Sequence, residues 1–125
     1  MNKKYLMMPI LLGFMLFNST NLMAGPAIQE IASIIINLHH HPSDSEKASL
    51  EKIAKDGSTS ENEKTIAMAL MDMNHRVSAS DKAKLEKIAN DSSAPQEDRT
   101  VAGILADINH KPSDADVAQL KKLQN

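Results

Sequence analysis

From residue 26 to the C-terminus, apolar residues recur every three or four positions, the spacing of one face of an α-helix. Two kinds of segment alternate. One kind carries a narrow apolar stripe among Lys and Glu residues, as in "LEKIA" at 50–54, and the other is apolar over a wide face, as in residues 28–38. We therefore predict an all-α chain in which polar outer helices cover strongly apolar inner helices.

Serine residues mark the predicted helix starts. The stretch "SDSE" at 43–46 is a capping box, in which the Glu46 side chain reaches back to the backbone N–H of Ser43. Ser78 and Ser113 occupy the same position before the later outer helices. Before one inner helix, "SAPQ" at 93–96 predicts a start at Ser93, with a proline in the first turn.

The whole pattern repeats with a period of 35 residues. Residues 40–74 and 75–109 are identical at 17 aligned positions, about two or three being expected by chance. A partial copy spans 110–125, and residues 25–39 match the second half of a copy. We expect about six helices in three helix pairs, stacked as a short helical-repeat solenoid within a single domain, 25–125.

The turn before the last inner helix, "DSSAPQEDRTVAGIL", is similar to the inter-helix turn of HEAT repeats, in which an Asp precedes a basic and a small residue. Here Asp91, Arg99 and Ala102 carry the likeness, which is echoed in the preceding copy by Asp56, Lys64 and Ala67. A tetratricopeptide-like packing describes the same helices nearly as well. The resemblance implies a scaffold that binds proteins along one face, and it implies no chemistry.

The first 24 residues have the pattern of a secretory signal peptide. Lys3 and Lys4 precede an apolar run at 6–17, and small residues follow. The run is shorter than the roughly 20 residues that span a bilayer. We expect cleavage after Ala24, with Ala27 as the alternative, and export to the periplasm or beyond with no membrane attachment afterwards. A buried N-terminal helix is the competing interpretation.

The composition after cleavage narrows the classes of function. Residues 25–125 contain no Phe, Tyr, Trp or Cys and have a formal charge of −4. Without aromatic residues or a basic run, nucleic-acid binding is not expected. Nucleophile elbows, zinc-protease motifs and phosphate-binding glycine loops are also missing from the sequence. We therefore expect neither an enzyme nor a cofactor.

One histidine recurs in each copy, at His40, His75 and His110, where an inner helix ends. A polar or cationic side chain is favourable beside the last carbonyls of a helix, so these residues first suggest helix joints. Stacked helices about 8–10 Å apart would spread the three over roughly 20 Å, too far for one ion. The metal alternative is therefore a weak surface site for a divalent ion or copper at His39, His40 and His41, near a Met-rich helix.

A second face of the inner helices suggests where a protein partner would bind. Small and apolar residues form a ridge there, at Ile36, Met68, Met71 and Ala106. The alternative is that the outer helices bury this ridge. The sequence thus predicts a protein-binding module, such as an immunity protein, a chaperone or an inhibitor, with low-affinity metal binding as the alternative function.

Overall fold

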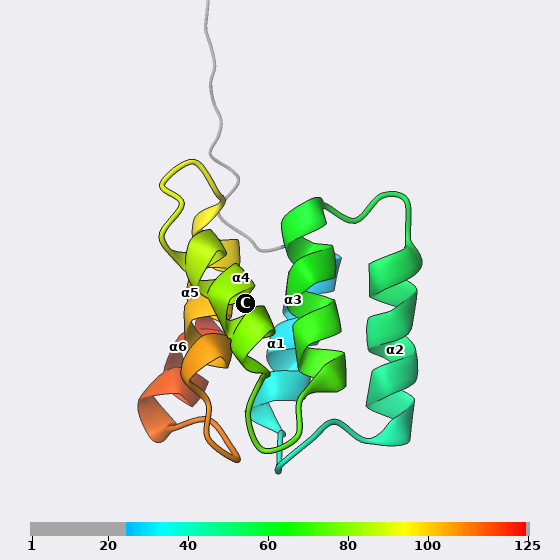
Figure 1. Ribbon diagram of the computed structural model, residues 1–125, viewed down its shortest axis with the longest axis vertical. Helices are drawn as coiled ribbons and strands as arrows, with labels where there is room; N and C mark the ends of the chain where they lie inside the picture. The colour runs from blue at the N-terminus through cyan, green and yellow to red at the C-terminus, as the bar shows by residue number, and fades with distance from the viewer. Residues whose placement is uncertain (1–24, 125) are drawn as a thin grey trace, which may run out of the picture.

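The computed structural model describes residues 25–124, so the predicted signal peptide lies outside the described residues. Within them the chain forms six helices and no strand, which confirms the all-α helical-repeat fold. Figure 1 shows the helices as antiparallel neighbours whose connecting loops gather at two ends of the molecule. In chain order the helices are α1 (Pro26–Ile36), α2 (Asp44–Lys55), α3 (Glu61–Asp72), α4 (Ala79–Ala89), α5 (Gln96–Asp107) and α6 (Asp114–Lys122).

The odd-numbered helices form the inner layer, as the apolar pattern predicts. Four to six residues of each are buried, whereas each outer helix buries only one or two. Each inner helix buries at least one alanine together with larger apolar side chains. The fully inaccessible positions repeat from copy to copy: Ile31, Ile66 and Val101; Ala32, Ala67 and Ala102; Ile35, Leu70 and Leu105; and Leu50, Leu85 and Leu120.

The three copies close into a ring. Helix α2 packs mainly on α3, and α4 packs on α5 in the same way. The last helix, α6, packs on the first, α1, so the two partial copies complete each other as a third helix pair. The inner helices α1, α3 and α5 also contact one another pairwise, and they therefore surround a common axis. The 35-residue period predicted the repeated copies, but it did not predict that they close into a ring.

Side-chain caps fix most of the helix starts. Ser43, Ser60 and Ser113 each begin a complete capping box, and Ser78 accepts a hydrogen bond from the backbone N–H of Asp81. The predicted start at Ser93 is wrong: α5 begins two residues later, with Pro95 at the N-cap position. Within the described residues, no helix combines the length and the apolar character needed to cross a membrane.

Candidate metal centre

Each inner helix leads into a short loop with the same shape in every copy. In the first copy Leu38 and Pro42 are buried on either side of the loop tip, and the equivalent residues of the other copies are buried too. These apolar anchors hold both ends of the loop in the core and leave the tip exposed. At the tips, His40, His75 and His110 have φ values of 69°, 70° and 75°. This left-handed conformation is uncommon outside glycine, although histidine tolerates it better than most residues.

A closed set of backbone hydrogen bonds joins the three tips. The N–H of His40 donates to the carbonyl of His110, that of His75 to His40, and that of His110 to His75, each over 2.7 Å. Every tip therefore donates to one copy and accepts from the other. This arrangement gives the molecule an approximate three-fold axis through the loop tips.

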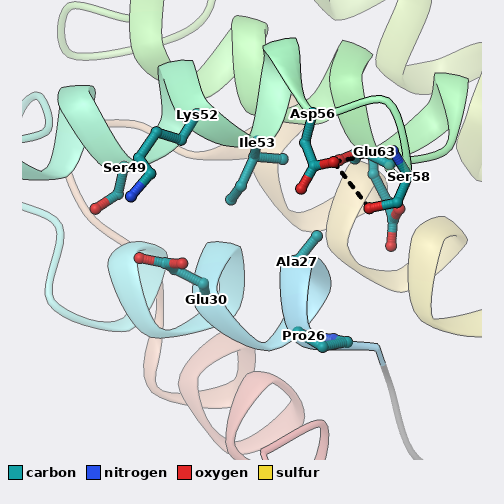
Figure 2. A pocket seen from close by; sticks show the side chains of 10 residues that line it. Pro26, Ala27, Glu30, Ser49, Lys52, Ile53, Asp56, Ser58 and Glu63 are labelled. Carbon is teal, nitrogen blue, oxygen red and sulfur yellow. Dashed lines mark hydrogen bonds between the residues drawn. The ribbon is translucent and has the colours of Figure 1, made fainter.

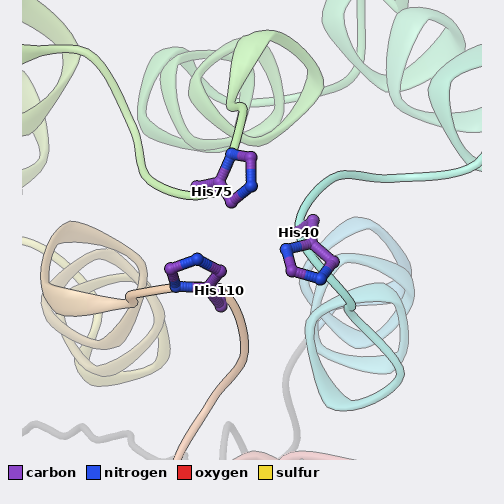
Figure 3. Close-up of side chains that lie close together, drawn as sticks. All are labelled: His40, His75 and His110. Atoms are coloured by element: carbon purple, nitrogen blue, oxygen red, sulfur yellow. The ribbon is translucent and has the colours of Figure 1, made fainter.

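The histidine side chains meet on this axis. Their ring centroids lie 4.7–5.0 Å apart, and the rings contact one another edge to face. Figure 3 shows the three imidazoles converging at the centre, each from a different helix pair. The expected separation of roughly 20 Å is therefore wrong, because it assumed an open stack of helices. In the closed ring, equivalent positions near the axis come together.

The donor set fits a transition-metal ion. Each histidine offers one ring nitrogen, and these nitrogens all lie within 4.8 Å of one another. Three nitrogens bound to a tetrahedral Zn²⁺ at about 2.0–2.1 Å would lie about 3.4 Å apart. All three side chains are exposed, so rotation about their side-chain bonds can bring the nitrogens together without moving the core. The solvent side of the cluster then offers an open coordination position.

The electrostatics of the cluster favour neutral imidazole at His40. Partial desolvation lowers the pKa of this residue, and the charges that His75 and His110 carry when protonated lower it further. Neutral imidazole is the form that binds a metal ion. The inner helices α1, α3 and α5 also end at this side of the molecule, and helix C-termini carry partial negative charge.

The cluster also has a structural role without an ion. Edge-to-face contacts between rings contribute about 0.5–1.5 kcal/mol per pair beyond area burial. The left-handed backbone, however, is more favourable for Gly or Asn than for His. Backbone conformation alone therefore does not account for histidine at all three tips.

The other residues of the predicted metal site lie beside the cluster. His39 and His41 flank the first tip, where the backbone N–H of His41 donates to the carbonyl of His39 over 2.7 Å. The Nδ1 atom of His41 lies 3.0 Å from the Pro42 carbonyl oxygen. Of the predicted His39–His41 site, the structure thus brings only His40 together with other histidines, and these come from the later copies.

The predicted partner-binding ridge is mostly covered. Ala106 is buried in the core, and Ile36 and Met71 are half-buried against it. Only Met68 is strongly exposed, with 50% of its surface accessible. The four residues do not form one continuous exposed patch, since the helices pack over much of the ridge.

The opposite end of the axis carries a different group of residues. Ile28, Glu63 and Asp98 occupy equivalent positions in the first turns of the inner helices. Within residues 25–124, Asp98 is the only charged side chain that is buried, with 4% exposed. Burial, together with the charge of Glu63, raises the pKa of Asp98 to about 6, and a hydrogen bond with Asn62 offsets only part of this rise.

Sequence reasoning missed His75 and His110 as partners of His40. The signal was present in the sequence, since residues 25–39 match the second half of a copy and residues 110–125 match the first half. Two such halves can pair only when the ring closes.

Comparison of the chain with protein families, with curated proteins and with solved structures gave no match.

Proposed function

We propose that this protein binds one divalent transition-metal ion through His40, His75 and His110. The observation that carries the proposal is the convergence of three imidazoles, one from each copy, with donor nitrogens within 4.8 Å of one another. The backbone hydrogen bonds between the three loop tips already hold the histidines near one another, so the backbone loses little conformational entropy when an ion binds.

Zn²⁺ fits this arrangement best. Imidazole suits zinc, copper and nickel, whereas Ca²⁺ and Mg²⁺ prefer oxygen ligands. Three nitrogens around a three-fold axis occupy one face of a tetrahedron, which is the geometry of zinc. Cu²⁺ prefers a square-planar set, which three such nitrogens do not supply, although its intrinsic affinity for nitrogen ligands is higher.

The exposed position of the site supports binding or buffering of the ion rather than catalysis. All three histidines are exposed at the loop tips, so a substrate would find few walls to hold it there. If residues 1–24 act as the predicted signal peptide, the ion would be held in the periplasm or outside the cell. We propose this location together with the function.

Calorimetric titration with Zn²⁺ tests the proposal. We expect one ion per chain for the wild type, and a loss of affinity of more than about 100-fold for His75→Phe, which keeps a ring but removes the nitrogens. The matched control is His39→Asn, which changes a neighbouring histidine outside the cluster and should bind normally. Equal binding by His75→Phe, or loss of binding in His39→Asn, would place the ion elsewhere.

Protein binding is a second candidate function, supported by the exposure of one hydrophobic side chain. Met68 is the only large hydrophobic residue that is strongly exposed among the described residues, and flexible Met side chains suit adaptable contacts. The resemblance to HEAT-type repeats points the same way and stays a prediction. Met68→Asp should abolish capture of a specific partner from a periplasmic extract without changing helicity, and unchanged capture would remove this face from consideration.

A further inference from the structure

Two carboxylates at the end of the axis opposite the histidines lack a cation. Neither Glu63 nor Asp98 takes part in any of the ion pairs found within residues 25–124. Asp98 stands at the third helical position of α5, where a capping-box residue would bond the N-cap backbone N–H. Pro95, the N-cap residue, has no N–H, and the Asp98 carboxyl is buried instead.

One carboxylate oxygen of Glu63 accepts a hydrogen bond, and the other lies near the start of the first helix. Its Oε1 atom accepts a hydrogen bond from the backbone N–H of Ser60 over 2.9 Å. Its Oε2 atom lies 3.9 Å from the point where a Cβ would stand on Gly25. The Gly25 nitrogen is about 2.5 Å from that point, so it lies within about 6.5 Å of the carboxylate oxygen.

Figure 2 shows this region from the groove between α1 and α2. Pro26 and Ala27 of α1 line the groove together with Glu63, which reaches it from α3. Gly25 immediately precedes these residues and is exposed, and no side chain caps α1 at this point. A charged group on the Gly25 nitrogen would therefore lie beside the acidic end of the axis.

We propose that hydrolysis of the peptide bond between Ala24 and Gly25 creates an α-ammonium group that pairs with Glu63. One water is consumed, Ala24 keeps the new carboxylate, and the amine released on Gly25 takes up a proton at neutral pH. An endopeptidase of the signal-peptidase class would carry out the step. The new cation also reduces the repulsion that Glu63 exerts on Asp98.

Two effects of opposite sign act on this ammonium group. The partial positive charge at the start of α1 disfavours a cation there, so the helix dipole alone predicts that blocking the amine stabilises the protein. Pairing with Glu63 predicts instead that blocking the amine destabilises the protein. The chain that begins at Gly25 contains all six helices and the entire described core, so it is a suitable protein for the test.

The experiment compares that chain with a free amine and with an acetyl group on Gly25 only, each with Glu63 and with the Glu63→Gln substitution. Glutamine keeps the capping box and removes the charge. In urea unfolding at pH 7, we expect the free amine to raise the folded-to-unfolded ratio about fivefold in the chain with Glu63, and to give no such gain in the Glu63→Gln chain. The advantage should disappear above about pH 9, where the α-amine is neutral.

Three results would overturn the proposal. The acetylated chain could prove equally or more stable, or the free amine could stabilise the Glu63→Gln chain to the same degree. The mass of the protein exported from a Gram-negative host could also show a start at a residue other than Gly25. None of these results depends on metal binding at the histidine cluster.

Discussion

The histidine at each loop tip combines an uncommon backbone conformation with a side chain that can bind metal. His75→Asn separates the two, because Asn tolerates the left-handed region and has no imidazole. Without metal, we expect its free energy of unfolding to fall by no more than about 1–3 kcal/mol, the contribution of the two ring contacts that His75 makes. With free Zn²⁺ at about 100 times the wild-type dissociation constant, only the wild type should gain about 2.7 kcal/mol.

Thermal or urea unfolding with and without Zn²⁺ measures both quantities. A large loss of stability in the metal-free variant would mean that ring packing is the main role of the cluster. The recurrence of one histidine per copy was readable from the sequence. Its left-handed backbone was not, because that conformation depends on hydrogen bonds between copies that only ring closure creates.

The raised pKa of Asp98 predicts that the stability of the protein depends on pH. The pKa is raised to about 6 in the folded chain, against about 3.9 when unfolded, so the folded state holds its proton more tightly. Asp98 makes its full contribution to the free energy of unfolding below about pH 4, and this contribution is lost as the pH rises through 6. The difference between the two pKa values corresponds to at most about 3 kcal/mol.

The Asp98→Asn variant should therefore match the wild type near pH 4 and be the more stable protein near pH 8. Urea unfolding across this range provides the comparison. A variant that is less stable than the wild type at pH 8 would show that the carboxylate is favourably paired in the folded chain.

The predicted helix starts at Ser43, Ser78 and Ser113 are confirmed, because each serine side chain accepts a hydrogen bond from a backbone N–H in the first turn. At α5 the prediction placed the cap at Ser93, but the side chain of that residue bonds Asp91 instead, with Oγ donating over 2.6 Å. Ser60, in contrast, caps α3 in a complete capping box. The inner and outer faces were predictable for a different reason, since burial follows the helical period directly.

Two serine-to-alanine variants test the cap assignment. Ser60→Ala should destabilise the protein by about 1 kcal/mol, the usual cost of losing an N-cap side chain. Ser93→Ala should cost less, because it removes one exposed hydrogen bond, from the Ser93 Oγ to Asp91, and keeps the bond from the Ser93 backbone N–H to the same carboxylate. Chemical denaturation of both variants gives the comparison, and a larger cost at Ser93 would favour the helix start predicted from the sequence.

The two partial copies, residues 25–39 and 110–125, pair with each other through α1 and α6. Asn125 aligns with Asn90 and Gly25 with Pro95, so the ends lack only the four residues equivalent to 91–94. The period predicted the number and order of the copies. It did not predict the rotation from one copy to the next, which decides between an open stack and a ring and which depends on how the apolar faces of the inner helices meet.

A circular permutant tests this closure. Residues Asp-Ser-Ser-Ala, copied from 91–94, would join Asn125 to Gly25, and new ends would be opened between Gly57 and Ser58 in an exposed loop. In a closed ring the permutant should fold with helicity like that of the wild type and a stability within about 1 kcal/mol, since the closed loop is short. Circular dichroism and urea unfolding measure both. An open stack would not tolerate this connection, and the permutant would then be unfolded or aggregated.

Anomalous diffraction at the zinc edge, from crystals of the Zn²⁺-loaded protein, would locate the ion and the loop tips together. We predict a single ion on the approximate three-fold axis, bound by one nitrogen each of His40, His75 and His110 at about 2.0–2.1 Å. An ion bound instead at His39 and His41 would contradict the metal site, and three loop tips lying apart with no ion between them would contradict both the metal site and the closed ring.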